Sequence, residues 1–147
     1  FWQAFSDDNG CTWRTLQASA IEASSAPGAM IRLGSGRILL VWNRLGPAEG
    51  GRPYGTASDR NDGQHTEFPA SWFREELSMA VSEDEARSWS SPVMLARQPG
   101  ELCYPYLFER CPGEIWITAG ITWLGPWGGA KAAPFRVKID ERDIPRM

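Results

Sequence analysis

Two stretches decide the fold of this 147-residue chain: Ser6-Asp7-Asp8-Asn9-Gly10-Cys11-Thr12-Trp13 and Ser82-Glu83-Asp84-Glu85-Ala86-Arg87-Ser88-Trp89. They are copies of one motif, 76 residues apart, and each lies between two apolar segments. The third-position Asp can accept hydrogen bonds from N–H groups of its own turn, and Gly10 tolerates a positive φ at little cost. The final Trp can pack on neighbouring strands. The motif therefore predicts tight β-turns, with structural roles for Ser6, Asp8, Gly10, Thr12, Trp13, Ser82, Asp84, Ser88 and Trp89.

The remaining segments favour short strands. The chain contains 15 Gly and 11 Pro, a content that favours turns over long helices. Phe135, Val137 and Ile139 alternate with polar residues, as in a half-exposed strand. Residues 71–87 are rich in helix formers and could instead form a helix. Because alternate residues of 77–81 are large and apolar and the second motif follows at once, we predict a strand over 74–81.

The two motifs resemble Asp-boxes, also called bacterial neuraminidase (BNR) repeats, which occur in the six-bladed β-propellers of the sialidase superfamily. Residues 74–82 resemble the strand that carries the third arginine of the sialidase triad. Cys103-Tyr104-Pro105-Tyr106-Leu107 resembles the segment with the catalytic tyrosine. The chain departs from the family pattern at Ala86, which replaces the glycine of the box, and at Pro105, where the family more usually has serine.

The resemblance implies an all-β fold, a partial β-propeller of two to three blades of four-stranded antiparallel sheet. Asp-boxes in such blades join the third and fourth strands, on the rim away from the active site. The expected strands are 1–5, 14–20, 28–33, 37–44, 74–81, 92–97, 103–109, 114–123 and 135–139. The chain would divide into a partial blade (1–26), a blade (27–98) and an incomplete last blade (99–147). It resembles the C-terminal half of a larger protein, entered partway through a domain.

A sialidase resembling this chain removes a terminal sialic acid through a tyrosine nucleophile. Three arginines grip the sugar carboxylate, a glutamate takes the tyrosine proton, and an aspartate serves as acid/base. Two of these parts have matching positions here, namely Tyr104 as nucleophile and Arg74 as a carboxylate-binding arginine. The alternatives are a tyrosine packed between blades and a solvated arginine beside Glu75 and Glu76. Residues 1–70 contain no match to the other catalytic parts.

Residues 45–73 form a long connection, and connections of this length in compact folds are usually functional or mobile. By the blade assignment it lies on the active-site face and leads into Arg74. We expect it to contact substrate, with candidate substrate-binding residues Arg52, Tyr54, Arg60, His65 and Trp72. A lone His in a polar loop is more often an ordinary surface residue, and the whole connection could instead be a disordered insertion.

Composition narrows the possible partners. The formal net charge is −3 and no basic block occurs, so nucleic-acid binding has no electrostatic basis. The longest aliphatic-aromatic run, 38–42, is far too short to span a membrane. No Cys or His cluster has metal spacing, and no cofactor is expected. Cys103 and Cys111 lie eight positions apart, too far in an extended chain to bridge each other. By resemblance the protein would be secreted or periplasmic.

Two functions therefore remain. The first is glycoside hydrolysis, in which the complete parent releases a terminal sialic acid or similar acidic sugar. The second is a non-catalytic carbohydrate-binding or scaffold propeller, because function depends on the site and not on the fold. The expected partners are a glycan and either a second copy of the chain or the missing part of the propeller, since the open strand edges invite pairing.

Overall fold

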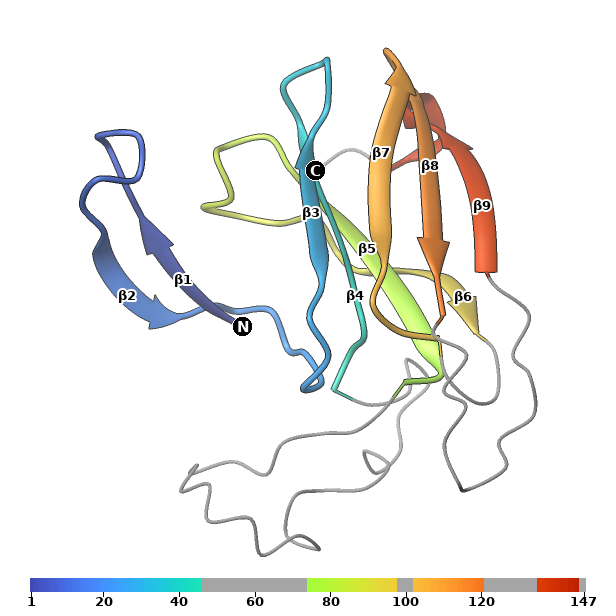
Figure 1. Cartoon of the computed structure of the whole chain (residues 1–147), viewed down its shortest axis with the longest axis horizontal. Helices are drawn as coiled ribbons and strands as arrows, with labels where there is room; N and C mark the ends of the chain where they lie inside the picture. The colour runs from blue at the N-terminus through green and yellow to red at the C-terminus, as the bar shows by residue number, and fades with distance from the viewer. Residues whose placement is uncertain (46–73, 98–101, 121–134, 146–147) are drawn as a thin grey trace, which may run out of the picture.

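The protein is all-β (Figure 1). The computed structural model describes residues 1–45, 74–97, 102–120 and 135–145, which form antiparallel sheets of two, four and three strands. The strands are β1 (Trp2–Phe5), β2 (Arg14–Ala18), β3 (Ala29–Arg32), β4 (Ile38–Trp42), β5 (Glu76–Ser82), β6 (Val93–Arg97), β7 (Tyr106–Cys111), β8 (Glu114–Ala119) and β9 (Phe135–Asp140), followed by the short 3-10 helix Glu141–Asp143. This arrangement confirms the expected all-β class and is consistent with a partial propeller. No helix in the described ranges could span a membrane.

The central strands of the second sheet form the middle of the molecule. Every residue of β4 and β5 is buried, whereas the edge strand β3 alternates between half-buried and exposed residues. Both faces of β4 and β5 are therefore covered, which accounts for the unbroken apolar run of β4. The strand predicted to begin at residue 74 is confirmed over β5, and the helical alternative is wrong in the described part of 71–87. Cross-strand pairing and burial outweigh the local helix propensity.

Two apolar clusters lie on opposite faces of the second sheet. The larger cluster packs one face of β4 and β5 against the third sheet, and its centre consists of Leu39, Val41, Leu77, Met79, Val81, Leu107, Ile115 and Ile117. The smaller cluster consists of Leu40, Trp42 and Ala80, with Ile21, Ala23 and Trp89 packed against it. The second and third sheets are thus stacked face to face, and strands β3 and β7 lie next to each other at their shared edge.

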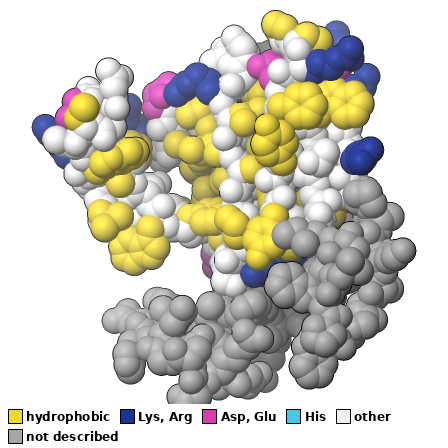
Figure 2. All heavy atoms as spheres, in the orientation of Figure 1, with side chains coloured by type: hydrophobic (Ala, Val, Ile, Leu, Met, Phe, Trp, Pro, Cys, Tyr) yellow, Lys and Arg dark blue, Asp and Glu magenta, His cyan; other side chains and the backbone are white. Residues whose placement is uncertain are grey.

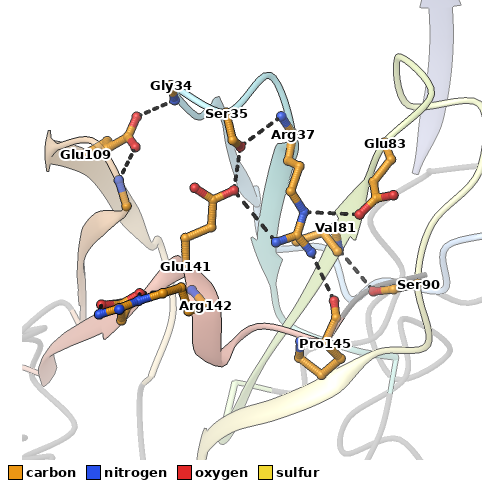
Figure 3. A network of polar contacts seen from close by, with 12 residues as sticks. Gly34, Ser35, Arg37, Val81, Glu83, Ser90, Glu109, Glu141, Arg142 and Pro145 are labelled. Carbon is orange, nitrogen blue, oxygen red and sulfur yellow. Dashed lines mark hydrogen bonds and ion pairs between the residues drawn. The ribbon is translucent and has the colours of Figure 1, made fainter.

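A polar network joins the second and third sheets (Figure 3). It lies at the end of these sheets where the hairpin turns are. The Glu109 carboxylate of β7 accepts the Gly34 N–H at 2.6 Å. Arg37 donates to the Pro145 carbonyl at 3.0 Å and lies 3.6 Å from the Glu141 carboxylate. Because both Asp-box turns lie at this same end, we call it the turn end and the other the loop end.

The first sheet is packed much less closely than the other two. It consists of only β1 and β2, and their register shifts between Gln3 and Phe5. The side chains of Trp2 and Leu16 are 73% and 74% exposed, and Figure 2 shows apolar side chains gathered over this sheet. A cavity of about 340 Å³ lies between β1 and the second sheet. This sheet therefore has little buried apolar surface to stabilise it.

Two strand boundaries differ from the expected ones and matter for function. Arg74 precedes β5, which begins at Glu76, and Tyr104 precedes β7, which begins at Tyr106. Tyr104 has a left-handed backbone with a φ of 53°, so it cannot continue an extended strand. Pro105 has no N–H to donate to a strand partner. Both candidate residues therefore lie in connections at the loop end and not inside strands.

Candidate functional site

The first Asp-box turn is held by its own side chains. The Asp8 carboxylate accepts the Thr12 N–H at 2.8 Å and the Thr12 hydroxyl at 2.6 Å. The Ser6 hydroxyl donates to Asp8 at 2.8 Å and accepts the Gly10 N–H at 2.7 Å. Trp13 is 66% exposed, and its ring lies 3.7 Å from where a side chain on Gly10 would begin.

The second Asp-box turn repeats these contacts. Asp84 accepts the Ser88 N–H at 2.8 Å and the Ser88 hydroxyl at 2.5 Å, while Ser82 accepts the Ala86 N–H at 2.9 Å. Ala86 adopts a φ of 62° at the position where Gly10 has 85°. Trp89 packs against the smaller apolar cluster, so this turn is anchored to the second sheet.

The carboxylates of both turns are committed to the turn itself. Hydrogen bonds from Thr12 lower the pKa of Asp8 to about 2, and hydrogen bonds from Ser88 lower the pKa of Asp84 to about 2. Each carboxylate is therefore ionised at neutral pH and its acceptor positions are occupied by neighbours. Such groups are suited to holding a turn and not to transferring protons.

Arg74 and Tyr104 belong to neighbouring segments at the loop end. The Leu102 N–H donates to the Arg74 carbonyl at 2.7 Å, so the chain just before β5 runs beside the chain just before β7. The next residue, Cys103, accepts the Gly120 N–H at 2.9 Å. Strands β5 and β7 begin at the end opposite the Asp-box turns (Figure 1), so the segments that carry the two candidate residues lie at that end.

The Arg74 guanidinium contacts two hydroxyl groups. Nη1 donates to Ser24 Oγ at 2.8 Å and Nη2 donates to Ser25 Oγ at 2.9 Å. Both serines come from the connection between β2 and β3, and Ser24 is only 6% exposed. Each hydroxyl accepts from Arg74 and keeps its own proton as a donor. A guanidinium is a planar fork of N–H donors whose shape matches a carboxylate, and here Nη1 and Nη2 each use one donor on a serine.

The Tyr104 side chain is 46% exposed and stands on a backbone conformation that is unusual for a non-glycine residue. Such outliers persist only where the surroundings enforce them, and they cluster at functional sites. A half-exposed phenol can donate or accept a hydrogen bond and can act as a nucleophile once a base removes its proton.

The other candidates are placed as follows. Arg52, Tyr54, Arg60, His65 and Trp72 lie outside the described residues. In the described ranges no group of Asp, Glu, His or Cys could hold a metal ion. No disulfide joins Cys103 to Cys111, as expected from their spacing, and none joins either of them to Cys11.

Three residues near Arg74 and Tyr104 were not foreseen from the sequence. Asn43 is fully buried and donates to two carbonyls at this end, and Ser24 and Ser25 hold the Arg74 guanidinium. The position of Asn43 directly after the apolar run of β4 is a weak sequence signal that this residue has a structural role. Nothing in the sequence connects Ser24 and Ser25 to an arginine about 50 positions away.

A comparison with known protein families matches most of the chain. The family model of the BNR repeat-like domain matches residues 1–117, which include both Asp-box turns, β5 and Tyr104. No curated protein and no solved structure shows a significant match to the chain. Since the matched region covers well over half of the sequence, this chain belongs to the family of the BNR repeat-like domain.

Proposed function

We propose that this chain supplies Arg74 and Tyr104 to a carbohydrate site of a sialidase-like protein that hydrolyses a terminal sialic acid or a similar acidic sugar. The observation that carries this proposal is the 2.7 Å hydrogen bond from Leu102 N–H to the Arg74 carbonyl. It brings an arginine and an exposed tyrosine, 30 positions apart in the sequence, into neighbouring segments at the end opposite the Asp-box turns.

In this proposal Arg74 binds the sugar carboxylate. A guanidinium fork matches the shape of a planar carboxylate, and the sugar would bind beside the Ser24 and Ser25 hydroxyls that accept from Nη1 and Nη2. Tyr104 acts as the nucleophile: a base takes its proton, its oxygen bonds to the anomeric carbon as the glycosidic bond breaks, and an acid protonates the departing aglycone oxygen. Water then cleaves the bond between the sugar and Tyr104 and releases the free sugar. The sequence contains no recognisable match to that base.

The missing match favours a second candidate function. The site has one recognisable carboxylate-binding arginine, and its tyrosine has no recognisable base. Such a site could bind an acidic sugar without cleaving it. The chain would then be part of a non-catalytic carbohydrate-binding or scaffold propeller. Turnover separates the two: we expect the chain alone not to hydrolyse a fluorogenic sialoside. Turnover that is lost on Tyr104→Phe would show that the chain itself is catalytic.

Binding tests both candidates. We expect the chain to bind a methyl α-sialoside more tightly than methyl β-galactoside, which lacks the carboxylate. Arg74→Lys keeps the charge but loses the paired donors, so it should weaken sialoside binding by about tenfold. The matched control is Arg32→Lys, because Arg32 pairs with Glu85 at the turn end and is 50% exposed. Equal affinity for the two sugars would contradict the proposal.

We also propose that the outward faces of the first and third sheets are covered by another chain. Trp2 and Leu16 on the first sheet, and Tyr106 on the third, are 73%, 74% and 67% exposed. A second copy of the chain, or propeller blades supplied by another chain, could cover them. Light scattering at micromolar concentration should report a mass above the 16.4 kDa of one chain. A folded, monomeric species of that mass would overturn this proposal.

A further inference from the structure

Asn43 is an uncharged, fully buried polar residue at the loop end of the second sheet. It directly follows β4 and is 0% exposed. Burying an amide costs free energy that its hydrogen bonds offset. Within the described part of the chain the Asn43 Oδ1 has no hydrogen-bond partner, so the contacts of its Nδ2 show which segments the side chain joins.

The Asn43 side chain joins two segments of the backbone. Its Nδ2 donates one hydrogen bond of 2.7 Å to the Glu76 carbonyl and one of 2.7 Å to the Leu102 carbonyl. Glu76 begins β5, two residues after Arg74, and Leu102 lies two residues before Tyr104. Both amide hydrogens are thus used, one on each of the segments that carry the candidate residues.

The Asn43 backbone extends this connection to the serines. Its carbonyl accepts the Ser24 N–H at 2.9 Å, and Ser24 Oγ in turn accepts from the Arg74 guanidinium. One residue therefore links the segments before β3, before β7 and at the start of β5.

Tyr104 follows a stretch of chain that is held at several points. Leu102 is bonded through its N–H to Arg74 and through its carbonyl to Asn43, and the Cys103 carbonyl accepts from Gly120. Tyr104 then adopts its φ of 53°. A left-handed conformation of a non-glycine residue needs surroundings that enforce it, and these bonds supply them on its N-terminal side.

We propose that Asn43 is a positioning residue for Tyr104. By donating to Leu102 and Glu76 at once, it fixes the backbone that leads into Tyr104 and aligns that backbone with the one that follows Arg74. This proposal rests on the role of Tyr104 given above. Only an amide fits the position well, since Asp would offer no donor and Ser only one.

The test follows the Tyr104 ring directly. The chain contains three tyrosines, Tyr54, Tyr104 and Tyr106, so 3-fluorotyrosine labelling gives three ¹⁹F resonances, each assigned by a Tyr→Phe variant. In Asn43→Asp we expect the Tyr104 resonance to move toward its position in the urea-unfolded chain. The Tyr106 resonance should stay in place, because Tyr106 pairs with Thr118 in the sheet.

A matched control removes a different buried polar group. Ser78 is 0% exposed and its hydroxyl has no hydrogen-bond partner within the described part of the chain, so Ser78→Ala should leave the Tyr104 resonance unchanged. A general loosening of the fold in Asn43→Asp would move the Tyr104 and Tyr106 resonances together. A folded Asn43→Asp chain with an unmoved Tyr104 resonance, or with both resonances moved, overturns the proposal.

The same samples distinguish a failure of this positioning proposal from a failure of the proposed function. If the unsubstituted chain binds no sialoside, the proposed function fails, while the ¹⁹F shift still tests the positioning. If it does bind, Asn43→Asp should weaken binding about tenfold through the displaced site.

A second measurement applies if the Asn43 variant does not fold. Selective ¹⁵N-asparagine labelling of the unsubstituted chain reports the side-chain amides of Asn9, Asn43 and Asn61, assigned by Asn9→Asp and Asn61→Asp. Both Asn43 side-chain protons should exchange with solvent much more slowly than those of an exposed asparagine. Fast exchange would overturn the proposal.

Discussion

The two Asp-box turns have the same hydrogen bonds but different surroundings. In each, a carboxylate accepts from the N–H and the hydroxyl of the residue four positions on, at 2.8 and 2.6 Å from Asp8 and at 2.8 and 2.5 Å from Asp84. The first turn closes a two-stranded sheet, and its Trp13 is exposed. The second closes the buried central sheet, and its Trp89 packs on a cluster.

The difference shows that the motif determines the turn and the sheet beneath it determines how much the turn stabilises the fold. The hydrogen bonds are made within eight residues and form in both places. The burial of the final Trp depends on which sheet lies below. The same sequence pattern therefore contributes different amounts to the free energy of unfolding in the two turns. Substitutions at equivalent positions should therefore have unequal effects.

The largest expected difference comes from the two tryptophans. Trp89→Ala removes a ring packed against Leu40, Trp42 and Ala80 and should lower the free energy of unfolding by about 2–3 kcal/mol. Trp13→Ala removes a ring that is 66% exposed and should change it by less than about 0.5 kcal/mol. Urea denaturation of both variants measures this, and equal losses would show that the first sheet is as firmly packed as the second.

Substitutions of the two Asp-box carboxylates should differ in their effect on acid stability, by less than the two tryptophan substitutions differ. The folded-state pKa of Asp8 and of Asp84 is about 2, below the ordinary value of 3.8. Both groups thus stabilise the fold above pH 3.8, and this contribution is lost as the pH falls toward 2. We expect Asp84→Asn to flatten the decline of the melting temperature between pH 4 and pH 2, and Asp8→Asn to do so less.

Other carboxylates contribute to the same decline, so the comparison between variants is the informative quantity. The pKa of Asp140 is also lowered to about 2 by its contact with Arg142. The unsubstituted chain provides the reference. An Asp8→Asn effect equal to that of Asp84→Asn would contradict the unequal weights of the two turns.

The smallest effect concerns the glycine position of the motif. Ala86 has a φ of 62° and Gly10 a φ of 85°. Because a left-handed backbone costs alanine roughly 1 kcal/mol, Ala86→Gly should stabilise the chain by up to about 1 kcal/mol. Gly10→Ala should destabilise the first turn and leave global unfolding almost unchanged. Thermal melts measure the first effect, and amide exchange in residues 8–13 measures the second.

The sequence could predict what depends on local pattern. The turns follow from residues within one motif, and β4, β5 and β9 follow from apolar runs or alternation. The boundary at Tyr104 could not be predicted, because the two residues before it are held by bonds to Arg74, Asn43 and Gly120. These partners are distant in the sequence and are brought together only by the stacking of the sheets.

The candidate site was predictable to the same limited extent. Resemblance indicated Arg74 and Tyr104 one at a time, and the backbone bond between their segments explains why they lie at one end. Ser24, Ser25 and Asn43 carry no motif, because hydroxyls and amides are common and their role depends on a partner in space.

The most direct test of this account is a map of backbone amide shifts on addition of a methyl α-sialoside to the ¹⁵N-labelled chain. We predict shifts confined to the loop end, at residues 24–25, 74–75, 102–104 and 120, with both Asp-box turns unmoved. Shifts centred on residues 6–13 or 82–89, or no shifts at millimolar sugar, would contradict the placement of the carbohydrate site at Arg74 and Tyr104.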